Sequence, residues 1–367
     1  MPRQKGSRLW HRPIVTDRLG FRTLSVQQSR ALTHFNRTTS LQPQMAPSKQ
    51  QSSSFLTKAA GYALGGTVAV GTSAAVLAAL TQTPLGHALR VSAAVIVGLN
   101  TVGFIATALT KSHKVTDLTG TSAFVGSAWA THYLACKATG MALLAPSKSL
   151  LMTGMVTLWG ARLAGYLFYR VLVVGEDARL RQFFPKDDKE PALTGESKFP
   201  LKLAGFWTVQ GMWAWVVLLP VTVSHAMAPA AAITPLGWLC AAGFFAGWGL
   251  EAVADYQKFR FKNKPENKDK FITHGAFSLC RYPNYAGEIA LWTGLWGLAA
   301  AGVAGFAMQY PWTLVSPGFT ILLTTFISGI PTQEGSHDKR YGDREEYQRY
   351  KASTNMLLPW PRSNKVD

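Results

Sequence analysis

The chain has 367 residues, and its composition argues against an ordinary soluble enzyme: 48% of the residues are hydrophobic and only 15% are charged, below the roughly 25% that is usual for soluble domains. Thirty-seven Lys and Arg against nineteen Asp and Glu give a formal net charge of +18, which in an apolar chain indicates basic loops beside a membrane rather than nucleic-acid binding. Its three scattered cysteines support neither a disulfide framework nor a zinc or other metal site.

Residues 1–55 form a separate zone of the sequence, because they are basic, rich in Ser and carry a single acid, Asp17. An Arg-rich, Ser-rich and acid-poor leader is typical of an organellar transit peptide. A disordered basic tail, or translation that starts at Met45, explains the same composition. We therefore expect the protein in the endoplasmic reticulum or in an organellar (mitochondrial or plastid) membrane.

The rest of the sequence predicts an all-α integral membrane helix bundle over residues 56–331. A helix that crosses a bilayer needs about 20 apolar residues. Eight stretches have about that length: residues 57–80, 86–110, 121–145, 149–174, 204–226, 231–256, 284–306 and 311–331. We therefore expect about eight transmembrane helices, followed by a cytosolic segment over residues 332–367.

The charges of the loops agree with an even number of spans. No Lys or Arg occurs in the connections near 81–85, 227–230 and 307–310, whereas those near 111–120, 175–203 and 257–282 are rich in them. Because Lys and Arg gather in cytosolic loops, we place the basic loops and both termini on the cytosolic face.

Arg162 is a charged residue deep inside the fourth predicted span. Charge in the bilayer is costly, so such residues usually face a cavity or a partner. Trp159, Tyr166 and Arg170 share one face of the helix with it. A purely structural alternative is that Arg162 pairs with a buried acid.

A second polar stripe contains Glu251, Asp255, Lys258 and Lys262, which fall on one helical face. Pairing within the stripe could neutralise these charges without any function. Two acids near the end of a span can also accept hydrogen bonds from a ligand's hydroxyl and amide groups, while the lysines bind phosphates. The stripe therefore marks a candidate binding surface.

The most informative stretch is Arg281-Tyr282-Pro283-Asn284-Tyr285-Ala286-Gly287-Glu288. Pro283 suits the first turn of a helix, so a span begins there and its N-terminus lies beside Arg281, as an anion site would require. Asn284, Glu288 and Trp292 then follow one face into the bilayer. A capping role for Asn284 would explain neither of the other two.

Near the C-terminus, Glu334, His337, Arg340 and Tyr341 follow the last predicted span. By themselves they indicate only a solvated amphipathic helix.

Together these residues resemble the steroid 5-alpha reductase family, in particular a branch of multispanning proteins of largely unassigned substrate. The resemblance extends from about Asp117 to Pro359. The matching segments are Asp117-Leu118-Thr119-Gly120, Arg162 with Tyr166 and Arg170, Gly175-Glu176-Asp177, Phe206-Trp207 with Gln210 and Trp213, Glu251 to Asp255, Arg281 to Glu288, and Tyr341 to Tyr347.

The resemblance implies NADPH-dependent reduction of a carbon–carbon double bond conjugated to a carbonyl, in a lipophilic, sterol- or isoprenoid-like substrate that enters from the bilayer. The positions that match the family's cofactor-binding residues are Arg162, Asp255, Lys262, Asn284, Glu288 and Trp292, and the segment His337–Tyr341 matches loosely. The cofactor would then also meet Glu251, Lys258, Arg281 and Arg340, so that residues 332–367 complete its site.

Two positions depart from the family's pattern. Lys262 stands where those enzymes carry an arginine, which keeps the charge but loses the bidentate fork. Trp159 stands where they carry a proton-donating tyrosine, and an indole N–H is no general acid near neutral pH. The proton donor must therefore lie elsewhere, and Tyr166, Tyr285 and Asp117 are the candidates.

Two other functions remain open. Related Arg-x-Pro-x-Tyr motifs occur in isoprenylcysteine carboxyl methyltransferases, so a membrane methyltransferase that uses S-adenosylmethionine is an alternative. That cofactor has no phosphates, which would leave Lys258 and Lys262 unexplained. A non-catalytic lipid-binding membrane protein is the other alternative, and Trp159 supports it.

Overall fold

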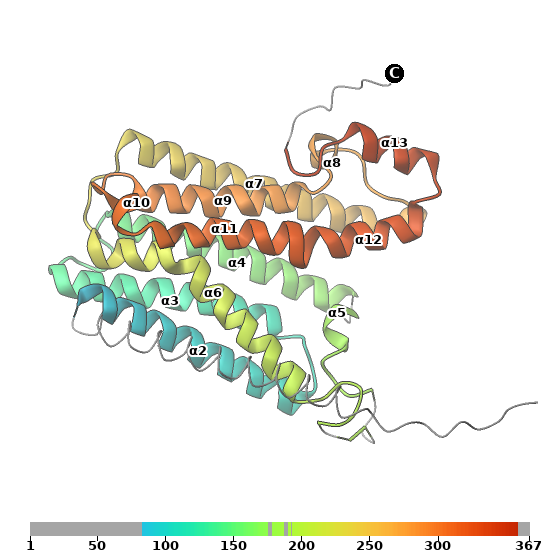
Figure 1. Ribbon diagram of the computed structural model, residues 1–367, viewed down its shortest axis with the longest axis horizontal. Helices are drawn as coiled ribbons and strands as arrows, with labels where there is room; N and C mark the ends of the chain where they lie inside the picture. The colour runs from blue at the N-terminus through green and yellow to red at the C-terminus, as the bar shows by residue number, and fades with distance from the viewer. Residues whose placement is uncertain (1–82, 175–177, 187–189, 192, 359–367) are drawn as a thin grey trace, which may run out of the picture. The chain divides into compact units, whose positions relative to one another are not determined.

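The computed structural model describes residues 83–174, 178–186, 190–191 and 193–358. The leader 1–55, the first predicted span 57–80 and the motif Gly175-Glu176-Asp177 lie outside these residues. The described part is built from helices (Figure 1), so the all-α fold class is confirmed for it.

In the part of the chain that the structure describes, the bundle consists of six long helices and one interrupted helical run. The long helices are α2 (Pro84–Thr110), α3 (Thr116–Thr139), α4 (Lys148–Val174), α6 (Leu201–Met227), α7 (Pro235–Lys262) and α9 (Pro283–Ala300). The run consists of a 3₁₀ turn (Pro311–Leu314), α11 (Val315–Leu322), a π-helical turn (Leu323–Ile327) and α12 (Gly329–Tyr341). Short helices are α5 (Ala178–Arg181), a 3₁₀ turn (Pro265–Asn267), α8 (Ala276–Leu279), α10 (Phe306–Gln309) and α13 (Glu345–Ser353).

Local sequence explains where several helices begin and end. Thr83 caps α2 by accepting a 3.0 Å hydrogen bond from the Gly86 N–H, and Thr234 caps α7 in the same way at 3.2 Å. A proline occupies the first turn of α2, α7 and α9, where its missing N–H costs nothing. The predicted start of a helix at Pro283 is therefore confirmed.

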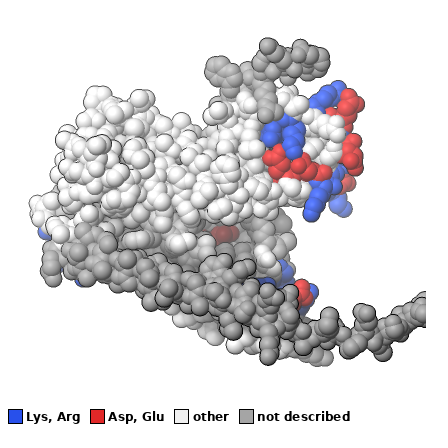
Figure 2. Space-filling model, viewed as in Figure 1, with Lys and Arg blue, Asp and Glu red and all other residues white. Residues whose placement is uncertain are grey.

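Four helical segments of the described residues are long and apolar enough to cross a membrane: Pro84–Thr110, Leu201–Met227, Pro235–Lys262 and Pro311–Tyr341. The expected eight spans are not confirmed. Helices α3, α4 and α9 match predicted spans in position, but they are not among these four segments, and α4 and α9 carry the polar residues singled out above. In Figure 2 the charged side chains gather over α12 and α13, while the surface over α7 and α9 is almost uncharged.

Helices α7 and α9 run side by side and approach very closely (Figure 1). A Cβ placed on Gly247 of α7 would lie 2.6 Å from the Gly287 carbonyl oxygen, and one on Gly287 would lie 2.5 Å from the Gly247 carbonyl oxygen. Small residues of this kind allow two helix backbones to touch. The contact brings Glu251, one turn after Gly247, close to Glu288 of α9.

The last helical run differs from the predicted span 311–331, because it continues to Tyr341 and changes geometry on the way. The π turn ends at Ser328, and α12 begins at Gly329. The predicted boundary between bundle and C-terminal segment at residue 332 therefore falls inside α12. Beyond α12, α13 lies next to α8 at the end of the bundle (Figure 1).

Candidate functional site

Arg162 of α4 joins two acids of α7. Its Nη1 atom donates a 2.7 Å hydrogen bond to Asp255 Oδ2, and its Nη2 atom forms an ion pair with Glu251. The three side chains are largely buried, with 14%, 14% and 6% of the side chain of Arg162, Asp255 and Glu251 exposed. The pairing of Arg162 with a buried acid, which the structural alternative foresaw, is thus present, and it involves two acids.

Glu288 of α9 lies near this cluster and interacts electrostatically with Arg162, Asp255 and Glu251. The structure thus brings three carboxyl groups around one guanidinium. One cation cannot neutralise three ionised acids in an apolar interior. At least one acid is therefore suited to bind a proton or to accept a hydrogen bond from a ligand.

Several buried polar atoms next to this cluster have no hydrogen-bond partner among the described residues. They are Asn284 Oδ1, Trp292 Nε1, Trp159 Nε1 and Glu251 Oε2. Buried polar atoms nearly always form hydrogen bonds, so an exception indicates a partner that is absent from the structure, such as a ligand or water. Asn284 does not cap α9, so its amide is available to such a partner.

An aromatic cluster contributed by four helices lies deeper in the bundle than the acids. The centroid of the Trp159 ring is 4.8 Å from that of Trp292 and 5.0 Å from that of Phe124. The ring centroids of Phe124 and Trp213 are 4.8 Å apart. Trp159 and Trp292 are almost completely buried. The predicted stripes Trp159–Arg162 and Glu288–Trp292 therefore meet along their length.

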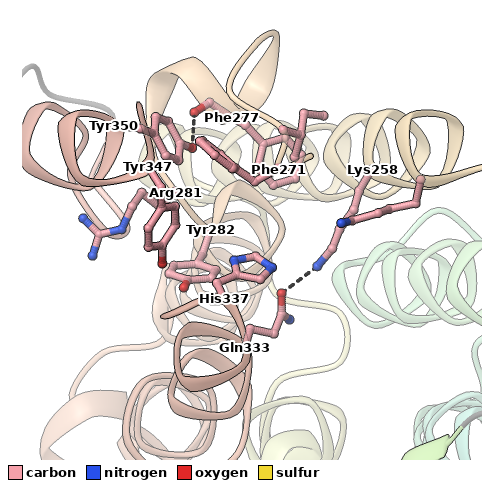
Figure 3. Close-up of a pocket in the computed structure, with 11 residues that line it drawn as sticks. Lys258, Phe271, Phe277, Arg281, Tyr282, Gln333, His337, Tyr347 and Tyr350 are labelled. Atoms are coloured by element: carbon pink, nitrogen blue, oxygen red, sulfur yellow. Dashed lines mark hydrogen bonds between the residues drawn. The ribbon is translucent and has the colours of Figure 1, made fainter. Parts of the chain in front are cut away.

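A pocket lies at the end of the bundle near α8 and α13. Its walls come from five segments: Lys258 and Lys262 of α7, Phe271 and Ile272, Phe277 of α8 with Arg281 and Tyr282, Gln333 and His337 of α12, and Tyr347 and Tyr350 of α13. In Figure 3 the Lys258 ammonium points toward Gln333 and His337. Cationic and aromatic side chains together suit a phosphate-bearing, ring-containing ligand.

The pocket's tyrosines are protonated at neutral pH. Burial raises the pKa of the Tyr282 hydroxyl, and the nearby Glu334 carboxylate raises it further. Burial also raises the pKa of Tyr350, whose hydroxyl donates a 2.7 Å bond to the Phe277 carbonyl. These phenols are neutral hydrogen-bond donors.

Arg281 lines the pocket, but its guanidinium holds the chain's own C-terminal segment. It donates to the carbonyls of Lys351 and Thr354 at 2.9 and 2.8 Å, and it pairs with Glu334 at 3.2 Å. In Figure 3 it points away from Gln333 and His337. Two backbone bonds, from Arg281 N to Asn355 O and from Tyr282 N to Met356 O, add to the same contact.

Two other predicted residues also bind the chain itself. Arg340 is exposed and donates to the Lys268 carbonyl and to Asp269 Oδ1, both at 2.7 Å. Tyr341 is 1% exposed, and its hydroxyl donates to the Lys270 carbonyl at 3.1 Å. Tyr341 also contacts Lys262, whose ammonium donates to the Tyr341 hydroxyl at 3.3 Å.

The three candidate proton donors lie in different places. Tyr166 of α4 reaches the backbone carbonyl of Asp255 at 3.4 Å, so it borders the acid cluster. Tyr285 of α9 accepts a 2.5 Å hydrogen bond from Gln333 Nε2, beside the pocket. Asp117 lies in the first turn of α3, a helix that packs mainly against α2, α4 and α6.

Sequence reasoning missed Gln333, and it also missed a buried group at the opposite end of the bundle. Lys148 is 1% exposed and donates to the Ala299 and Ala301 carbonyls, both at 2.8 Å. His132 and His225 are fully buried and bond to Ser and Thr hydroxyls. The sequence signal for this buried group was Lys148 itself, a lysine directly before the predicted span 149–174.

Comparison with known proteins identifies the family. Residues 103–354 match the model of a family described as "Protein of unknown function (DUF1295)", and the chain belongs to this family. It is a steroid 5-alpha reductase-like group, so the resemblance is confirmed at that level. The family description names no activity. No curated protein and no solved structure matches the chain.

Proposed function

We propose that this protein is a membrane-embedded NADPH-dependent reductase of a carbon–carbon double bond conjugated to a carbonyl, in a lipophilic, sterol- or isoprenoid-like substrate. One observation carries the proposal. The cationic pocket adjoins the start of α9, from which Asn284, Glu288 and Trp292 lead inward to the acid and aromatic clusters.

The residues present fit such a cofactor. Lys258 and Lys262 supply charges for its phosphates, and Phe271, Tyr347 and Tyr350 supply aromatic surface. Deeper in the bundle, buried polar atoms that have no partner in the described chain, such as Asn284 Oδ1, can bond to its amide or hydroxyl groups. When bound, NADPH supplies the hydride for the reduction.

The chain's own residues then have three tasks. The aromatic cluster around Trp159 and Trp292 excludes water from the reacting atoms, which strengthens polar contacts there. A tyrosine or a protonated acid donates to the substrate carbonyl, and such a donor contributes ~3 kcal/mol as negative charge develops on that oxygen. It also supplies the proton that completes the reduction.

The test is a binding titration of the purified protein in detergent. We expect NADPH to bind, and Lys258→Gln to weaken binding about tenfold, the equivalent of 1.4 kcal/mol. Lys264→Gln is the matched control, because Lys264 is exposed and outside the pocket lining. Asn284→Ala and Glu288→Gln should also weaken binding.

The same titration with S-adenosylmethionine separates the alternatives. Binding of S-adenosylmethionine without NADPH would favour a methyltransferase and would overturn the proposal. NADPH binding without oxidation by any lipid extract would instead favour a non-catalytic lipid-binding protein. Unchanged NADPH affinity in both Asn284→Ala and Glu288→Gln would contradict the placement of the site.

A further inference from the structure

Gln333 of α12 forms a bridge between two residues on different helices. Its Oε1 atom accepts a 2.6 Å hydrogen bond from the Lys258 ammonium on α7, a contact that is drawn in Figure 3. Its Nε2 atom donates a 2.5 Å hydrogen bond to the Tyr285 hydroxyl on α9. One amide thus joins a cation of the pocket to one of the candidate proton donors.

The direction of both hydrogen bonds follows from chemistry. An ammonium can only donate, so the carbonyl end of the Gln333 amide must face Lys258. The amide's NH₂ group is then left for Tyr285, whose oxygen accepts. The phenol hydrogen of Tyr285 is therefore directed away from Gln333, toward other groups.

The fold holds this arrangement in place. The π turn and Ser328 interrupt the last helical run just before Gly329, and π turns often occur at functional sites. A Cβ on Gly329 would lie 3.0 Å from Cζ of Tyr285 and 2.6 Å from the Thr324 carbonyl oxygen. Glycine at this position lets the Tyr285 ring pack against the break, one turn before Gln333.

We infer that Gln333 is a positioning residue that couples an anion bound in the pocket, through Lys258, to the orientation of the Tyr285 hydroxyl. This inference rests on the proposed function, which supplies the anion as the phosphates of NADPH. A lysine ammonium has three donors, so Lys258 can hold Gln333 and a phosphate at once. A cofactor in the pocket then fixes Gln333 and, with it, the direction in which Tyr285 donates.

The experiment places 3-fluorotyrosine at position 285 in the full chain and records its ¹⁹F NMR resonance in detergent, with and without NADPH. We expect saturating NADPH to shift the resonance in the otherwise unaltered protein. Gln333→Leu should shift the resonance without NADPH and should abolish the further shift on NADPH addition. The dissociation constant for NADPH should rise less than about threefold in this variant.

Two further variants complete the design. Gln333→Glu keeps the side chain's size but offers only acceptors, so the Tyr285 hydroxyl turns to donate toward residue 333 and the resonance should move away from that of the unaltered protein. This variant tests the inference if Gln333→Leu does not fold. Gln309→Leu is the matched control, because Gln309 is exposed on α10, and it should leave the resonance unchanged.

The outcomes separate this inference from the proposed function. If NADPH binds normally and the same shift persists in Gln333→Leu and Gln333→Glu, the coupling is overturned and the reductase proposal stands. If NADPH binds to none of the proteins, including the unaltered one, the proposal and the inference fall together.

Discussion

At the scale of single residues, the interior charge of the bundle depends on Arg162. This guanidinium lies between Glu251 and Asp255, with Glu288 nearby. Removing one partner of a buried ion pair is far more costly than the pair's net contribution, because the remaining charge is left uncompensated. The arginine thus stabilises the buried acids of the candidate site.

Arg162→Met should therefore destabilise the protein by about 3–5 kcal/mol. Arg162→Lys should cost less, because a lysine keeps the charge but cannot bridge two carboxylates with a planar fork. The measurement is unfolding in detergent, with Arg260→Met as control, since Arg260 is exposed at the end of the same α7 helix that carries both acids. Equal stability of Arg162→Met and the unaltered protein would mean that the acids are neutral without it.

Lys148 is another buried cation of the described residues, and it has a different kind of partner. It donates to two carbonyls at the C-terminal end of α9, Ala299 and Ala301, where the helix dipole is negative. It thus ties the start of α4 to the end of α9.

We expect Lys148→Met to leave those two buried carbonyls without a donor and to cost about 1–3 kcal/mol for each group. Lys137→Met on α3 is the control, because Lys137 is exposed at the same end of the bundle. Thermal unfolding in detergent measures the difference. A stability equal to that of the control would show that water reaches Ala299 and Ala301.

At the scale of elements, the contact between α7 and α9 sets the spacing of the site. Gly247 and Gly287 let the two backbones touch. Glu251 lies four residues after Gly247, and Glu288 directly follows Gly287. A side chain at either glycine would push the helices apart and would move the acids with them.

Gly247→Ala should therefore cost about 1–3 kcal/mol of stability, the usual range for overpacking. Gly243→Ala on the same helix is a matched control, because its Cβ would meet nothing within 4 Å. There the change should be neutral or should stabilise the helix by up to about 1 kcal/mol. If both variants unfold at the same temperature, the close approach of α7 and α9 is not required.

The C-terminal segment, residues 332–367, was expected at the cofactor site only because of the family resemblance. Arg281 and the backbone of Tyr282 hold residues 354–356 against the start of α9. The same segment carries Tyr347 and Tyr350, which line the pocket and form its outer wall.

Arg281→Ala should release this wall and increase chymotrypsin cleavage at Tyr347 and Tyr350, while NADPH should slow it. Arg349→Ala is the control, because Arg349 is exposed and makes only a 3.9 Å pair with Glu345. Fragment analysis by mass spectrometry gives the cleavage rates. Equal rates in both variants would show that the backbone bonds hold the segment without Arg281.

At the scale of the whole molecule, the sequence predicts helices better than it predicts partners. Proline, threonine and glycine mark helix ends locally, so the start of α9 at Pro283 could be found from a few residues. Lys258 and Gln333 are 75 positions apart, and their contact depends on a π turn that has no sequence signature. The pairing of Arg162 with two acids was foreseen only as one of two possibilities, because helical spacing shows which residues share a face but not which face they meet.

The charge of the loops predicts a definite orientation in the membrane, which labelling can test. In a protein whose three cysteines are replaced by alanine, Asn263→Cys and Ser353→Cys should react with an impermeant maleimide only from the cytosolic side, and Ala230→Cys and Ala307→Cys only from the other. All four positions are exposed, and Ala230 and Asn263 flank α7, one of the four apolar spans of the described chain. Because Lys and Arg resist transfer across a membrane, we expect the basic end with the pocket to face the cytosol, where the proposed cofactor NADPH would reach it. Labelling of Ala230→Cys and Asn263→Cys from the same side would mean that α7 does not cross the bilayer, and the site would then have to be reached from outside the membrane.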